Sequence, residues 1–184
     1  TPGNCTFGGM VGYVGASPKA VIKNCLSIGT IQSAVTGQFF GAVKSNKCSI
    51  VNSFYQGTNV NGSASTVTLN PQEVTMATDE QLASSEVVLA LGIAWRQDLG
   101  TDAYPAPDAS KPVVVKIGDA EYATLYVDNA DITVPTGVKA FIAQIAEGKI
   151  EGGSDYQYLA LSEVDGVIPA GTPVILKGAP AIYE

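Results

Sequence analysis

The side chains that most often carry catalysis are unevenly represented in this chain. Histidine is absent from all 184 residues. Its absence excludes Ser-His-Asp and Cys-His nucleophile systems and almost every catalytic zinc site, because these use imidazole as base or ligand. A Ser-Lys dyad would need a serine on a strained turn or in a helix-borne motif, and the sequence contains no such signature. We therefore expect no nucleophilic or zinc-dependent chemistry.

Carboxylates are the second group that could do chemistry. Sixteen of the seventeen acidic residues follow residue 77, and by composition a pair of them could serve glycoside hydrolysis. The acids in 128–131 and 165–166 stand in turn-like sequences, where solvated carboxylates are common. Asp98, Asp102 and Asp108 lack the spacing of a calcium loop. We expect no enzyme activity, no metal and no cofactor.

Three cysteines complete the reactive side chains: Cys5, Cys25 and Cys48. Their spacings of 20 and 23 residues fit no metal-binding pattern. Small buried residues are the simplest interpretation. A Cys5–Cys25 disulfide is the alternative if the chain is exported.

Aromatic residues are the remaining candidates for binding a ligand, and Tyr55, Trp95 and Tyr104 are the ones we single out. Tyr55 belongs with Phe39, Phe40 and Phe54 to a group whose ordinary role is core packing. Trp95 and Tyr104 delimit an aromatic, arginine and acidic segment that could be a carbohydrate platform or a packed closing element. The ligand is unknown; a host protein or a glycan fits best.

The element that must position these residues is a repeat over residues 8–57. Gly8–Gly12 recurs as Gly37–Gly41 at an offset of 29, and Ile22–Leu26 recurs as Ile50–Phe54 at an offset of 28. A fixed period of this length signals stacked units, each too small to bury its own apolar face. Short β-forming runs and turn-like corners predict about two strands per copy, with the backbone of each copy paired to the next. The asparagines at equivalent corners, Asn24 and Asn52, suit left-handed backbone and a structural ladder.

Charge divides the chain near residue 78. Residues 1–77 carry a net charge of +3 and residues 78–184 a net charge of −10, for a total of −7. An acidic chain is a poor partner for nucleic acid. The longest apolar run, residues 87–95, is too short to span a membrane. Thr1-Pro2-Gly3 is an implausible natural start, so we expect a fragment whose missing N-terminus could have held an export signal.

A helix is predicted at Thr78–Leu91. Thr78 and Gln81 form a capping box, and Gly92 can end the helix. Ala83, Val87, Ala90 and Leu91 would make one apolar stripe that caps the last repeat or acts as a strut. The proline-rich residues 105–112 then form a stiff linker.

The last part of the chain reads as β structure throughout. Alternating or β-rich runs separated by turn signals predict six short strands in an antiparallel β-sandwich or barrel. These strands are Val113–Ile117, Tyr122–Val127, Val138–Ile145, Tyr156–Leu161, Pro173–Lys177 and Ala181–Tyr183. The expected organisation is therefore repeats over 1–77, helix and linker over 78–112, and a β domain over 113–184.

The first repeat resembles a known bacterial element. Gly8–Gly12, then Ile22–Cys25, then Gly29-Thr30-Ile31 look like the GLUG repeat, which occurs in arrays in surface proteins of Gram-negative gut bacteria. The second copy departs from the pattern at Gln38 and Ser53. The resemblance implies a short β-solenoid, β-helix-like, on an exported protein.

Two later segments extend this resemblance. Gln97-x-Leu-Gly-x-Asp-x-x-Pro105 is similar to a segment that ends such arrays, and the last strands resemble a small β domain that often follows. The resemblance implies a non-catalytic cell-surface or secreted module, adhesin-like or stalk-like, that binds a host protein or glycan. The alternative is an accessory region of a larger secreted enzyme, because the repeat also lies beside the catalytic domain of some immunoglobulin-cleaving metalloproteases.

Overall fold

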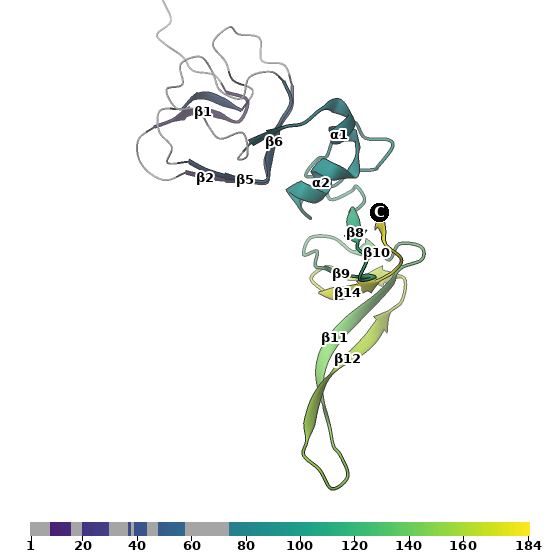
Figure 1. Ribbon diagram of the computed structural model, residues 1–184. Helices are drawn as coiled ribbons and strands as arrows, with labels where there is room; N and C mark the ends of the chain where they lie inside the picture. Colours follow the sequence, from purple (N-terminus) through teal and green to yellow (C-terminus); the bar gives the residue numbers. More distant parts are fainter. Residues whose placement is uncertain (1–7, 16–19, 30–36, 38, 44–47, 58–73) are drawn as a thin grey trace, which may run out of the picture. The chain divides into compact units, whose positions relative to one another are not determined.

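The computed structural model describes residues 8–15, 20–29, 37, 39–43, 48–57 and 74–184 (Figure 1). The chain forms two compact units, Thr1–Trp95 with Leu99–Pro105, and Arg96–Asp98 with Ala106–Glu184. In the described part it is mainly β, with two short helices. The prediction of a mainly β chain is therefore confirmed.

Strands of the first unit pair in parallel, and their register is that of the sequence repeat. Val11 lies beside Phe40 at an offset of 29, and Ile22 lies beside Ile50 at an offset of 28. Equivalent residues of the two copies are thus neighbours, as predicted, and parallel pairing follows from the long connection between equivalent strands. The pairs are β1 (Val11–Val14) with β4 (Phe40–Val43), β2 (Ala20–Lys23) with β5 (Cys48–Val51), and β3 (Leu26–Ser27) with β6 (Ser53–Tyr55).

A further strand continues one of these sheets. β7 (Val74–Met76) pairs in parallel with β6, and Phe54 lies opposite Thr75 at an offset of 21. The interval is shorter than the repeat, so this strand is no third copy. The extended stretch predicted at residues 66–69 lies outside the described residues.

The corners between strands use left-handed backbone at equivalent positions. Asn24 has a φ of 52° and Asn52 a φ of 46°, while Gly29 and Gly57 have φ values of 118° and 127°. Asparagine tolerates this region better than most residues, and glycine adopts it without strain. The left-handed geometry predicted for the two asparagines is confirmed.

Cys25 and Ser53, which occupy one repeat position, make the same contact. The Cys25 Sγ donates to the Lys23 oxygen at 3.2 Å, and the Ser53 Oγ donates to the Val51 oxygen at 3.1 Å. The Ser53 Oγ also accepts from the Cys25 backbone N–H at 3.3 Å, which ties the copies together. The Cys25 thiol is free. Cys5, its alternative disulfide partner, lies outside the described residues.

Two helices stand where one was predicted. α1 (Asp79–Ala83) begins with the predicted capping box: Gln81 N–H donates to Thr78 Oγ1, and Thr78 N–H donates to Gln81 Oε1. α2 (Ser85–Leu91) begins at Ser84, whose Oγ accepts from the Glu86 N–H and donates to the Gln81 oxygen. The single helix was wrong because Ser84 adopts extended backbone and caps a new helix instead of continuing the first.

This break changes which residues face the core. Leu82, Val87, Val88 and Leu91 are buried, whereas two members of the predicted stripe, Ala83 and Ala90, are exposed. The buried helix residues form one cluster with Leu26 and Ala77, against which Ile28, Phe54 and Trp95 also pack. The helices therefore cover strands β3 and β6 of the same unit.

The second unit is built on a four-stranded antiparallel sheet in the order β12-β11-β14-β9. These strands are β9 (Tyr122–Leu125), β11 (Lys139–Gly148), β12 (Tyr156–Val164) and β14 (Val174–Lys177). β8 (Val115–Ile117) pairs with β15 (Ala181–Tyr183), and β10 (Ile132–Thr133) pairs with β13 (Val167–Ile168). β9 and β12 are opposite edges that do not pair with each other, so the described strands form no closed barrel.

All six strands predicted in this unit are present, together with the two short strands β10 and β13 that were not predicted. One face of the sheet packs on an apolar core that includes Ile117, Leu125, Ala140, Val174 and Leu176. β11 pairs with β14 only through Phe141, while its pairing with β12 continues to Gly148. The far part of the β11–β12 hairpin therefore extends away from the sheet (Figure 1).

Candidate functional site

The three residues predicted as ligand contacts lie in different surroundings within the first unit. Tyr55 is half-buried against the cluster of Phe39, Phe40, Ile50 and Val74. Trp95 packs on the helix cluster, and its Nε1 donates to the Asn24 oxygen at 2.9 Å. Tyr104 is 48% exposed. The structure does not gather them into one site, and Tyr55 and Trp95 contribute to packing.

The other aromatic residues of the repeat also lie in the core. Phe39 and Phe40 are fully buried, with ring centroids 4.8 Å apart. Phe54 is half-buried on the helix cluster. This is the packing role that was expected for them.

Acidic side chains in the described turns accept hydrogen bonds from backbone N–H groups. Asp108 Oδ1 accepts from the N–H and the Oγ of Ser110, and Asp131 Oδ1 accepts from the Ala170 N–H at 2.9 Å. Across residues 8–184, as far as they are described, no cluster of three or more Cys, Asp or Glu side chains could hold a metal ion. The turns thus use their carboxylates as caps.

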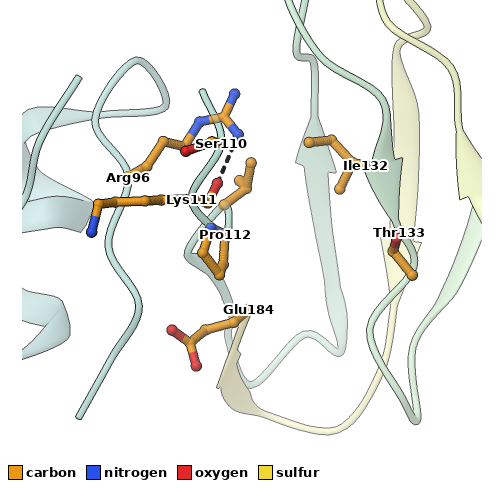
Figure 2. Close-up of a pocket in the computed structure, with 8 residues that line it drawn as sticks. Arg96, Ser110, Lys111, Pro112, Ile132, Thr133 and Glu184 are labelled. Carbon is orange, nitrogen blue, oxygen red and sulfur yellow. Dashed lines mark hydrogen bonds between the residues drawn. The ribbon is translucent and has the colours of Figure 1, made fainter. Parts of the chain in front are cut away.

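A buried guanidinium lines a cavity of the second unit. Arg96 is only 2% exposed, and its Nη2 donates to Asn129 Oδ1 at 3.2 Å while its Nη1 donates to the Lys111 oxygen at 3.4 Å. Its Nε is buried without a hydrogen-bond partner. Figure 2 shows the bond to Lys111 at the edge of a cavity of about 310 Å³. The lining comprises Arg96, Ser110, Lys111, Pro112, Val113, Ile132, Thr133 and Glu184.

The contacts of Arg96 are those of a structural clamp. Its backbone forms an antiparallel bridge with Ala106, and its side chain reaches acceptors at residues 111 and 129. One side chain therefore joins three separate segments of the unit. Burial lowers the pKa of Arg96 from its usual value, because the charged form loses hydration. Both acceptors are uncharged, so the cation is held by dipoles.

The solvent side of the four-stranded sheet carries apolar side chains from all of its strands. Ala123, Ala140 and Leu176 face the core in register, so their strand neighbours Thr124, Phe141 and Ile175 face outward. A groove of about 610 Å³ lies over this side. We call the outward side chains that line it the open face: Tyr122, Thr124, Leu159, Leu161 and Ile175. Apart from the Tyr122 and Thr124 hydroxyls, these side chains are hydrocarbon.

The open face continues onto the part of β11–β12 that leaves the sheet, residues 143–161, which we call the free hairpin. Both of its sides carry exposed apolar or aromatic side chains. Ile145, 74% exposed, lies opposite Leu159, 56% exposed, and Ala143 lies opposite Leu161. Tyr156 and Tyr158 occupy the other side, with ring centroids 6.0 Å apart. Large apolar side chains gathered on one exposed element make it a candidate interaction surface.

Polar contacts border this surface at its base. Lys139 Nζ lies 3.1 Å from a Glu163 carboxylate oxygen, and Lys177 Nζ lies 5.5 Å from the centre of the Tyr122 ring. An apolar centre with a charged rim is typical of protein interfaces.

Comparison with family models, with curated proteins and with solved structures finds no match. None of the described helices is long and apolar enough to cross a membrane.

The strands of the free hairpin were predicted from the sequence, but the exposed apolar surface that they form was not. The signal was available in Tyr156–Leu161, because the tyrosines stand at even positions and the leucines at odd positions, which places large side chains on both faces of the strand. A strand with apolar residues on both faces is usually covered on both faces. Arg96 carried no comparable signal, since its partners lie 15 and 33 residues away in the sequence.

Proposed function

We propose that this chain is a non-catalytic module of a cell-surface or secreted protein, which holds and displays a protein-binding sheet. The observation that carries the proposal is the free hairpin, where Ile145, Leu159 and Leu161 expose large apolar surfaces next to the open face. Covering such a surface removes hydrocarbon from water at about 25 cal/mol per Å². A folded protein partner that packs on these side chains would exclude water from them.

A protein fits this surface better than a glycan does. Sugars present hydroxyl groups that need polar partners when buried, and the aliphatic side chains of Ile145, Leu159 and Leu161 offer none. The Tyr156 and Tyr158 rings are tilted by 39° to each other, so they do not form one flat stacking platform.

The paired repeats support a holding role for the first unit. We take them to be the last turns of a longer β-solenoid of the GLUG type, closed by α1 and α2. The parallel register at the repeat offset supports this part of the proposal. The helix cluster also supports it, because this cluster packs against Leu26 of β3 and Phe54 of β6. A stalk of this kind needs a cap to prevent further strand pairing.

The proposal is tested by probing an array of host proteins and glycans with the full chain. We expect binding to protein spots, and its loss in an Ile145→Ser variant. Ile182→Ser is the matched control, because Ile182 is an exposed isoleucine on β15, in a different sheet of the same unit. Protein binding that survives Ile145→Ser, or binding confined to glycans, would contradict the assignment. Turnover of any arrayed peptide or glycan would exclude a non-catalytic module.

A further inference from the structure

The outer edge of β12 is not covered by any described strand. β12 is nine residues long and ends the sheet order β12-β11-β14-β9, so no described strand pairs with its far side. Edge strands usually discourage pairing with lysine, proline or a bulge. β12 contains no lysine or proline, pairs with β11 residue for residue over its whole length, and carries Glu163 as its single charge. This edge is therefore open to another strand.

The sequence of β12 is complementary to itself in one antiparallel register. With Ala160 placed opposite Ala160 of a second strand, Leu159 faces Leu161 and Gln157 faces Glu163. Opposite residues of an antiparallel pair point to the same side, so both leucine pairs extend the open face. The Gln157 amide can donate to the Glu163 carboxylate. Lys139 already contacts that carboxylate from the β11 side.

The two neighbouring registers are worse. A one-residue change in register would turn the open face of one copy to the other side of the sheet. The registers that keep both open faces on one side therefore differ by two residues. One shift places Asp155 opposite Glu163, and like charges directly opposite are destabilising. The other places Leu159 opposite Glu163, which sets a carboxylate against hydrocarbon.

We propose that β12 pairs with β12 of a second copy of this chain, antiparallel and with Ala160 at the two-fold axis, to give one continuous eight-stranded sheet. This rests on the proposed function, since it names a partner for the same hairpin. The two open faces then lie on one side of the joint sheet.

Cross-linking tests the register directly, in a full chain whose own cysteines are replaced by serine. Opposite Cα atoms in an antiparallel pair lie about 4.5–5.5 Å apart, within the range that a disulfide spans. We expect Ala160→Cys to form a covalent dimer on oxidation. Gln144→Cys is the matched control, because Gln144 lies beside Ala160 on β11, one strand farther from the proposed joint, and should remain monomeric. Equal cross-linking by both variants, or none by Ala160→Cys, overturns the proposal.

Mass in solution provides the second measurement, by sedimentation over a wide concentration range. We expect a dimer whose dissociation constant rises about a hundredfold in Leu161→Lys, because two symmetry-related leucine contacts are lost at about tenfold each. Ile182→Lys should leave it unchanged. A chain that is monomeric up to its solubility limit overturns self-pairing, while Ile145-dependent binding to arrayed proteins would still uphold the proposed function. A dimer that binds no arrayed protein would uphold self-pairing and would contradict the proposed function.

Discussion

Leu91 offers the sharpest test of how the first unit is held together. Its side chain is fully buried in the cluster that joins Leu82 and Val87 of the helices to Leu26 of β3. Leu91→Ala removes buried hydrocarbon and leaves a cavity, and such changes cost about 2–5 kcal/mol. Because Leu91 has no exposed surface, we take about 3 kcal/mol as the expected loss in unfolding free energy. That is a large share of the about 5–15 kcal/mol of a typical domain.

Trp95 supplies a local signal for this measurement. It is the only tryptophan of the chain, and its ring packs on the same cluster. Urea unfolding followed by tryptophan fluorescence therefore reports on the first unit. With a slope of about 2 kcal/mol per M, a loss of about 3 kcal/mol lowers the midpoint by about 1.5 M.

Ala90→Ser is the matched control for Leu91→Ala. Ala90 precedes Leu91 on α2 but is exposed, so its replacement should cost about 0.5 kcal/mol through helix propensity alone. If Leu91→Ala shifts the fluorescence midpoint no further than Ala90→Ser, then helix and strand residues do not share one core. The role of α1 and α2 as a cover for β3 and β6 would then be wrong.

Two further predictions concern a repeat corner and the clamp of the second unit. At Asn52, with its φ of 46°, replacement by alanine should lower stability by about 1 kcal/mol, whereas glycine should be within a few tenths; thermal unfolding that ranks alanine above glycine contradicts this. Arg96→Gln should cost about 2 kcal/mol, because the acceptors at Lys111 and Asn129 lose their donors; circular dichroism should show the second unit melting about 10 °C lower. Burial lowers the pKa of Arg96 in the folded chain. Below that pKa the side chain is protonated in both the folded and the unfolded chain, so its contribution to stability does not change with pH. Only above that pKa does this contribution rise with pH. The difference between Arg96→Gln and the unchanged chain should therefore stay constant from about pH 5 to about pH 8, and a slope across this range would contradict the assignment.

The parts of the fold that follow a local rule were predictable. The repeat offsets of 28 and 29 became the strand register, because equivalent residues pair when copies stack. Asn24 and Asn52 took the left-handed geometry that asparagine tolerates. The capping box at Thr78 formed for the same reason, since its partner Gln81 is only three residues away.

Features that depend on distant partners were not predictable. β10 and β13 have two residues each, too few for a periodic pattern, and they form because Ile132 meets Ile168 across the unit. Ser84 could extend one helix or cap the next, and the two helices that result pack Leu82, Val87 and Leu91 against Leu26, far away in the sequence. The candidate site fell in the same class: a run such as Tyr156–Leu161 predicts a strand, but periodicity does not say whether anything covers it.

Self-pairing through β12 would also stop at two copies, since the other edge of the sheet is poorly suited to continue it. β9 has only four residues, and Glu121 just before it has a φ of 63°, which breaks the extended backbone. Beyond β9 the chain turns at residues 128–130. A long open edge at β12 and a short interrupted edge at β9 favour a closed two-fold pair over a growing fibre.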